Sequence, residues 1–99
     1  MEVKIQSIHF DATEKLQAFI QKKMEKIGKY SDDVLSAQVV LKVEKPEATK
    51  NKNTSIMLFV KKDKLFCEKV CDTFEEGIDL CVDTLLRQLD KYKEKKRSK

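Results

Sequence analysis

The strongest structural signal in the chain is the stretch of residues 72–92, DTFEEGIDLCVDTLLRQLDKY. Its apolar side chains recur at helical spacing and form one continuous stripe: Phe74, Ile78, Cys81, Val82, Leu85, Leu89 and Tyr92. Asp72 or Thr73 can act as the N-cap, and Glu75 or Glu76 can complete a capping box. The stretch predicts a long amphipathic helix that packs one side on the rest of the domain.

The segments that precede this helix have a period of two, which is typical of strands. Residues 54–61 and 64–71 are two strand-like runs, and a tight turn around Lys62 and Asp63 joins them as a hairpin. Before them lies a long strand that starts at Val34 and is ended by Pro46, with a polar connecting loop from Pro46 to Asn53. The residues expected on one face of this strand are Leu35, Ala37, Val39, Leu41 and Val43.

The N-terminal region predicts a further strand and a further helix. Met1, Val3 and Ile5 alternate with polar residues, as in a half-buried strand. A helix is expected from about residue 13 to Gly28, with Asp11 or Thr13 as its cap and the glycine as its C-terminal stop. Its apolar stripe is Leu16, Phe19, Ile20, Met24 and Ile27.

These elements predict an α+β fold in the order β-α-β-β-β-α, with a four-stranded mixed sheet and two helices packed on one face. A chain of 99 residues has room for one core, so we expect a single domain over residues 1–99. The lysine-rich end, from about residue 94, is its only low-complexity segment, and the sequence leaves open whether that end is ordered.

The composition argues against several classes of protein. The chain starts without a secretory signal and has no run of about 20 apolar residues, and its three cysteines are an odd number, so a cytoplasmic protein is expected. Cys67 and Cys71 are expected to be small core residues. With one histidine, two glycines and no catalytic or metal-binding motif, the sequence predicts neither an enzyme nor a cofactor or metal site.

The positive charge is concentrated and sorted. Residues 91–99 carry six basic residues against one glutamate, a net charge of +5, so residues 1–90 together carry −1. On a helical wheel Lys15, Lys22, Lys26 and Lys29 fall within about 60° of one another. On the last helix Arg87, Lys91 and Lys95 follow one flank, and Glu75, Asp79, Asp83, Asp90 and Glu94 follow an adjacent one.

Sorting charges in this way gives up supporting ion pairs along each helix and creates a field that an anion can recognise. It favours RNA or DNA phosphate as the partner, with the two basic edges on either side of a groove between parallel helices. A purely structural alternative is that the terminal basic residues complement the negative end of the helix dipole or keep the tail solvated.

Two features do not fit the simple wheels. Lys23 falls inside the apolar stripe of the first helix, so either its stem lies along the core rim with the amine in solvent, or it binds a partner. The hairpin is apolar on both faces, with Ile56 and Leu58 on one and Met57 and Phe59 on the other. Helices on one face leave the other exposed, which predicts weak self-association or a protein contact.

Several short motifs now identify the chain as resembling a known family. They are Ile8-His9-Phe10, Lys23-x-x-Lys26 with Tyr30, the strand Val40-Leu41-Lys42-Val43-Glu44-Lys45, and Ile78-Asp79-Leu80-x-Val82-Asp83 followed by Arg87-Gln88-Leu89-x-Lys91-x-Lys93-x-Lys95. Together they resemble the short form of the ribosome hibernation promoting factor family, also called the ribosome-associated inhibitor A or sigma-54 modulation protein family. The resemblance spans essentially the whole chain.

The resemblance implies a protein that binds the small ribosomal subunit, in the channel for messenger RNA and transfer RNA. Such a protein contacts ribosomal RNA and inhibits translation in stationary phase or starvation. The RNA-binding residues that it implies here are Lys23, Lys26, Arg87, Lys91, Lys93 and Lys95. Wheel geometry adds Lys22 and Lys29, and the basic tail adds Lys96.

Two other kinds of protein remain open at this point. One is a double-stranded-RNA-binding domain that acts on non-ribosomal RNA, although that fold places lysines at the start of its last helix, where residues 72–83 here are acidic. The other is a protein-interaction domain that uses the apolar sheet face, for which binding would be insensitive to salt.

Overall fold

The computed structural model describes residues 1–44 and 50–97, with the backbone alone at residues 95–97. Its elements are β1 (Glu2–Ile8), α1 (Glu14–Tyr30), β2 (Val34–Val43), β3 (Lys52–Val60), β4 (Asp63–Cys71) and α2 (Phe74–Arg97). The predicted order β-α-β-β-β-α is confirmed. Within the described residues, no helix is both long and apolar enough to span a membrane.

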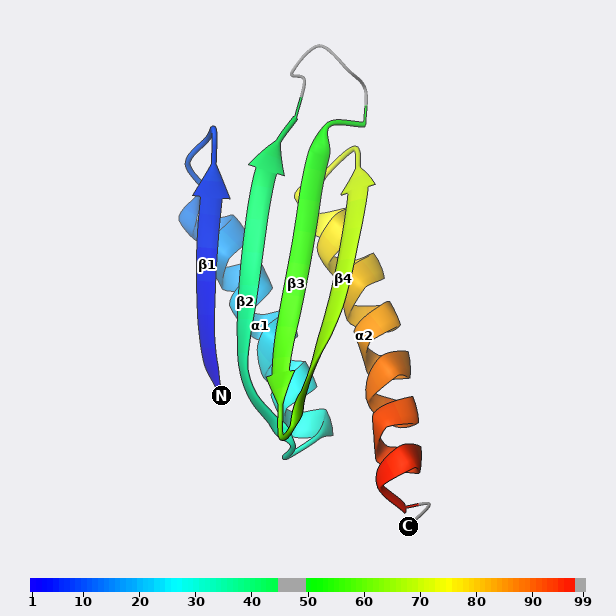
Figure 1. Ribbon diagram of the computed structural model, residues 1–99. Helices are drawn as coiled ribbons and strands as arrows, with labels where there is room; N and C mark the ends of the chain where they lie inside the picture. The colour runs from blue at the N-terminus through cyan, green and yellow to red at the C-terminus, as the bar shows by residue number, and fades with distance from the viewer. Residues whose placement is uncertain (45–49, 98–99) are drawn as a thin grey trace.

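The four strands form one mixed sheet in the order β1-β2-β3-β4. β1 pairs with β2 in parallel, whereas β2 with β3 and β3 with β4 are antiparallel. Both helices lie behind the sheet in Figure 1 and run in the same general direction. The predicted sheet with two helices on one face is therefore confirmed, and the opposite face is uncovered by the elements that the structure describes.

The core lies between the sheet and the two helices. Cross-strand partners such as Val39, Ile56 and Cys67 point to this side and are buried. The helices cover them with apolar stripes that include Ile20, Met24 and Ile27 of α1 and Ile78, Leu85 and Leu89 of α2. Cys67, Cys71 and Cys81 are buried free thiols, in agreement with the expectation that Cys67 and Cys71 are core residues.

Strand β2 departs from the predicted alternation at its start. The ladder with β3 shifts between Val34 and Ser36, a bulge that leaves Leu35 as an extra residue. As a result Val34 is buried and Leu35 is 53% exposed, so the assignment of Leu35 to the core face was wrong. From Ala37 onwards the predicted core face of β2 is confirmed at Val39 and Leu41.

Three predicted boundaries differ from the structure. Helix α1 continues past Gly28 to Tyr30, and the amide of Ser31 donates to the Ile27 carbonyl, so Gly28 is not the stop. The strands of the hairpin reach Val60 and Asp63, so the turn is Lys61 and Lys62, with a left-handed φ of 68° at Lys62. β3 starts at Lys52, inside the predicted loop, and residues 46–49 of that loop lie outside the described part of the chain.

Candidate nucleic-acid interface

The basic edge of α1 is fixed by the burial of its apolar stripe. The Thr13 hydroxyl caps the helix by accepting from the Leu16 amide at 3.1 Å. Four buried residues, Leu16, Ile20, Met24 and Ile27, then set the rotation of the helix about its axis. Three lysines on the solvent side are exposed and line a shallow hollow of about 440 Å³ with Lys23 and Glu25: Lys22, Lys26 and Lys29.

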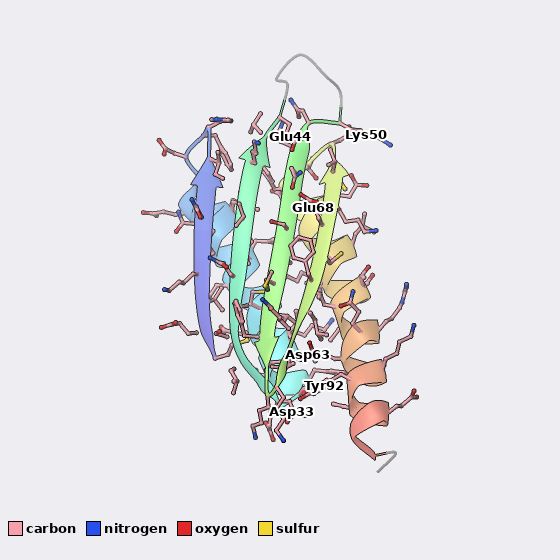
Figure 2. The ribbon with its side chains drawn as sticks, viewed as in Figure 1. Asp33, Glu44, Lys50, Asp63, Glu68 and Tyr92 are labelled. Atoms are coloured by element: carbon pink, nitrogen blue, oxygen red, sulfur yellow. The ribbon has the colours of Figure 1, made fainter. Side chains whose placement is uncertain are left out.

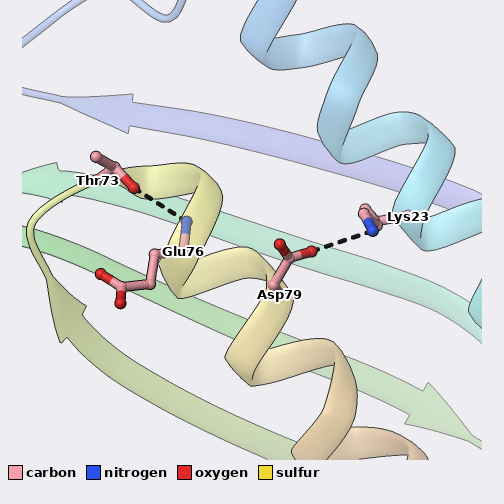
Figure 3. A network of polar contacts seen from close by, with 4 residues as sticks. All are labelled: Lys23, Thr73, Glu76 and Asp79. Carbon is pink, nitrogen blue, oxygen red and sulfur yellow. Dashed lines mark hydrogen bonds and ion pairs between the residues drawn. The ribbon is translucent and has the colours of Figure 1, made fainter.

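Lys23 lies beside this edge, at the contact between the two helices. Its ammonium forms an ion pair with the Asp79 carboxylate of α2 at 3.1 Å (Figure 3). The same nitrogen is 5.4 Å from the centre of the Phe19 ring, which adds a weak cation–π attraction. With 32% of its side chain exposed, Lys23 therefore combines the predicted packed stem with a specific acidic partner.

A second contact joins the helices at the C-terminal end of α1. The Tyr30 hydroxyl donates to Asp90 of α2, and the Lys93 ammonium lies 4.4 Å above the Tyr30 ring and donates to the Tyr30 carbonyl at 3.2 Å. The hydrogen bond to Asp90, desolvation and the aspartate charge together raise the pKa of the Tyr30 phenol. Lys93 is thus held at the junction of the two helices.

These contacts fix which side of α2 faces which neighbour. Asp79 and Asp90 place its acidic flank against α1. On the opposite flank, the Gln88 amide donates to the Phe66 carbonyl of β4 at 3.2 Å, and the Tyr92 hydroxyl donates to the Lys61 carbonyl. Lys91 lies about 60° from Gln88 on the helical wheel and is exposed toward the β4 side. Arg87 lies about 100° from Gln88, so it is exposed on the solvent side of α2, between Lys91 and the acidic flank.

The two basic edges are consequently separated by an acidic row. Asp79, Asp83 and Asp90 follow the side of α2 that faces the junction, between the lysines of α1 and the basic flank of α2. The sequence predicted edges on either side of a shared groove, but not that the groove would be lined by carboxylates. Phosphate groups are repelled from this row, so the geometry favours two separate tracks of phosphate contacts over one continuous basic channel.

The charge along α2 is also graded. Residues 74–86 carry a net charge of −4 and residues 87–97 a net charge of +4. This order complements the helix dipole at both ends, and the Thr73 hydroxyl accepts from the Glu76 amide at 3.1 Å as the N-cap (Figure 3). The acidic half stabilises the start of the helix, and the positive charge lies on the later half.

The structure therefore divides the predicted RNA-binding residues into three groups. Lys22, Lys26, Lys29, Arg87 and Lys91 are exposed on the two edges. Lys23 and Lys93 are half-buried and have partners at the helix junction. The side chains of Lys95 and Lys96 lie outside the described residues. Sequence reasoning used Tyr30 only as a motif residue and Asp90 only as part of the acidic flank. It did not predict their contact, which joins positions 60 residues apart and leaves no periodic signal.

No group of three acidic, cysteine or histidine side chains suited to a metal ion occurs within residues 1–44 and 50–97. The charged groups of this surface are the exposed lysine and arginine side chains on the two helices and the carboxylates of the acidic row between them.

Comparison with known proteins identifies the family of the chain and relatives that share its fold. Residues 3–97 match the family model for the sigma 54 modulation protein / S30EA ribosomal protein. The chain belongs to this family. One relative is the ribosome hibernation promoting factor of Escherichia coli K12, which is 32% identical over 95 residues, 96% of each chain. Another is the ribosome hibernation promoting factor of Pseudomonas putida KT2440, which is 28% identical over 98 residues, 99% of this chain and 92% of the relative.

Solved structures of two other proteins share the fold. A ribosomal subunit interface protein from Coxiella burnetii superposes with a TM-score of 0.84 at 19% identity, over 95% of this chain and 99% of that one. The N-terminal domain of Protein Y from Thermus thermophilus superposes with a TM-score of 0.78 at 22% identity, over 93% of this chain and 99% of that one.

Proposed function

We propose that this family member is a ribosome hibernation factor. In this proposal it binds the small ribosomal subunit in the channel for messenger RNA and transfer RNA, and it inhibits translation during stationary phase or starvation. The names of its relatives support hibernation as the process. The observation that carries the RNA contact is the pair of exposed basic edges on one side of the molecule, Lys22, Lys26 and Lys29 on α1 and Arg87 and Lys91 on α2.

The proposed action needs binding and no catalysis. Each exposed cation that meets a phosphate releases condensed counterions, so five such contacts predict a slope of about −4 in a plot of log affinity against log salt. A rigid domain held in the channel excludes messenger RNA and transfer RNA by occupying their space. The protein therefore acts where ribosomes are, in the cytoplasm, without a cofactor.

The acidic row gives the interaction a preference in shape. An RNA surface that fits the two edges must present two phosphate tracks separated by a gap over Asp79, Asp83 and Asp90. A folded RNA such as that of the ribosome can offer such a pattern. A regular duplex meets the start of α2 at acidic residues, which disfavours the alternative of a general double-stranded-RNA-binding domain.

Competition for the channel tests the proposal. Purified small subunits are incubated with the chain either vacant or preloaded with messenger RNA and transfer RNA, and the complexes are pelleted. We expect binding to vacant subunits, loss of binding to preloaded subunits, and weaker binding to a duplex RNA of matched length. Equal binding to vacant and preloaded subunits would exclude the channel, and tighter binding to duplex RNA would favour the alternative domain.

A further inference from the structure

The open face of the sheet, on the side away from the helices, carries an organised set of aromatic residues. Cross-strand partners share a face, so the register defines its rows. The row nearest the hairpin turn is Glu2, Ser36, Phe59 and Lys64, and the next is Lys4, Gln38, Met57 and Phe66. Phe59 and Phe66 are thus diagonal neighbours on adjacent strands, a spacing of about 7–8 Å.

These aromatic side chains reach solvent instead of the core. Phe66 is 49% exposed and Phe59 is 36% exposed. Their neighbours in sequence, Cys67 and Leu58, point to the other face of the sheet and are buried against the helices. Met57 lies half-buried across from Phe66 in the ladder. Two rings and a thioether therefore form a small apolar platform on β3 and the edge strand β4, near the hairpin turn.

Charged and hydrogen-bonding groups surround this platform. Lys64 lies directly across from Phe59, Lys4 lies in the row of Phe66, and the adjoining turn adds Lys61 and Lys62. Ser36 and Gln38 are the β2 partners of Phe59 and Met57, and their side chains can donate or accept hydrogen bonds. The platform is basic at the end of the sheet nearest the turn, although Glu2 closes the first row at its β1 end.

The other end of the same face, as far as the structure describes it, has no aromatic side chain and carries two carboxylates that accept from one amide, beside Lys42 and Val70. The Asn53 amide donates to the Glu44 carboxylate at 2.9 Å and to the Glu68 carboxylate at 3.1 Å. In Figure 2 Glu44 and Glu68 lie at the upper end of the sheet, far from Asp63 at the turn. Within the described residues of this face, only the turn end combines aromatic rings with cations.

We propose that the turn end of this face binds a single-stranded RNA segment, with bases stacked on Phe59 and Phe66 and backbone phosphates held by Lys64 and Lys4. Base stacking on aromatic residues of a sheet needs unpaired bases, and nearby lysines supply the phosphate attraction. The inference goes beyond the proposed function, because this surface faces away from the helix edges and binds RNA independently of them.

The sequence alone predicted weak self-association or a protein contact through this face. The structure favours RNA as the occupant because a stable dimer buries about 800 Å² per partner, with some 20–30 residues a side. Here the exposed apolar group on the two rows consists of three side chains and is bordered by Lys64, Lys4 and Glu2. Cations next to exposed rings suit a nucleic acid better than a second copy of a basic chain.

The test uses the full chain and a fluorescently labelled single-stranded RNA of about ten nucleotides at low salt. Changing Phe59→Ala or Phe66→Ala is expected to weaken binding between about 5-fold and 150-fold for each ring. Leu80→Ala is the matched control, since Leu80 is an apolar residue of α2 that is 42% exposed, and its binding is expected to stay unchanged. A duplex of the same sequence should bind more weakly than the single strand.

Substitutions that separate stacking from simple burial complete the design. Phe66→Tyr keeps a ring and should retain binding, whereas Phe66→Leu keeps the apolar area and should lose it. Equal binding by the Leu and Tyr variants would overturn the proposal. A second result would also overturn it: Arg87→Glu/Lys91→Glu loses oligonucleotide binding while the phenylalanine variants keep it. The RNA would then lie on the helix edges.

Sedimentation of the free chain distinguishes the remaining occupant. A dimer that disappears in Phe59→Ala/Phe66→Ala, with no binding of the oligonucleotide, would show that the face pairs two copies and would refute the RNA proposal. Binding to small subunits is measured separately with the helix-edge variants. The two proposals can therefore fail independently of each other.

Discussion

Lys23 of α1 and Asp79 of α2 form an ion pair of 3.1 Å that holds the acidic flank of one helix against the other. Both side chains retain solvent contact, with 32% and 55% of their surfaces exposed, so the pair contributes at most about 1 kcal/mol to stability. In the proposed binding to small subunits, its larger effect is on affinity, because it partly neutralises a lysine next to the exposed edge formed by Lys22, Lys26 and Lys29.

Asp79→Asn should therefore strengthen binding to small subunits. The substitution removes a negative charge from the acidic row and releases Lys23 to meet a phosphate. We expect affinity to rise about two- to tenfold at low salt, and the salt slope to become steeper by about one. Unfolding in denaturant should show a loss of less than about 1 kcal/mol.

Asp83→Asn is the control for this change, because it removes the same charge and leaves the Lys23–Asp79 pair intact. It should increase affinity less and leave the salt slope nearly unchanged. If the two variants bind alike and with the same slope, Lys23 contributes no phosphate contact of its own.

Two glycines of the helices should respond in opposite directions to alanine. At Gly77 of α2 an added Cβ would lie 2.6 Å from the Thr54 Oγ1 atom and 3.0 Å from its Cβ, inside the packed core. At Gly28 of α1 the nearest atoms belong to Met1 at 3.6 Å, an ordinary contact. Gly28→Ala should raise the free energy of unfolding by about 0.5–1 kcal/mol through helix propensity. Gly77→Ala should lower the free energy of unfolding by about 1–3 kcal/mol.

Denaturant midpoints measure both changes, and Thr54→Ala in the Gly77→Ala chain should recover part of the loss. A stabilised Gly77→Ala chain would show that α2 does not lie this close to β3.

The sequence predicted the elements well because the core obeys simple periods. The stripe of α2 and the alternation of β2 from Ala37 to Leu41 were correct, since each of these side chains meets a single core. The prediction for Leu35 was wrong because a one-residue bulge reverses the direction of the side chains locally. The hydrophobicity pattern alone does not reveal a bulge. The prediction that the first helix ends at Gly28 was wrong, because a glycine inside a helix and a glycine that ends a helix look the same in the sequence.

The site was predicted only in part for a related reason. The wheels correctly placed Lys22, Lys26 and Lys29 on one exposed edge of α1 and grouped Asp79 with Asp90 on one flank of α2. They could not predict which flank of α2 faces α1, because that depends on contacts such as Lys23–Asp79 and Tyr30–Asp90 between distant positions. The acidic row between the basic edges is therefore information that only the tertiary structure supplies.

The Tyr30–Asp90 contact predicts a dependence of stability on alkaline pH. The raised pKa of Tyr30 means that the folded state holds the phenolic proton more tightly than the unfolded state. The contribution is complete below the ordinary value of about 10 and is lost as the pH rises through the raised value. In a Tyr92→Phe background, where Tyr30 is the remaining tyrosine, ultraviolet titration should give a higher midpoint with Asp90 than with Asp90→Asn. Equal midpoints would contradict the contact.

The three thiols should be protected in the folded chain. Burial is the main cause that raises the pKa of the Cys81 thiol, and a hydrogen bond with Cys67 adds to it. Burial also raises the pKa of the Cys71 thiol. Because the thiolate is the reactive form, alkylation at neutral pH should be slow, with Cys81 the slowest, and should become rapid in denaturant. Mass spectrometry of a labelling time course checks this, and rapid modification of Cys81 in the native chain would argue against the packing of α2 on β4.

Co-sedimentation with small ribosomal subunits tests the central claim most directly. Arg87→Glu/Lys91→Glu reverses the basic flank of α2, and Lys50→Glu/Lys69→Glu reverses two exposed lysines elsewhere; either pair changes the net charge from +4 to 0. With unfolding midpoints confirming that both variants fold, we predict at least about a tenfold loss of subunit affinity and a shallower salt slope for the first variant, and little change for the second. Equal co-sedimentation of the two variants would contradict the assignment of the helix edges as the RNA-binding surface.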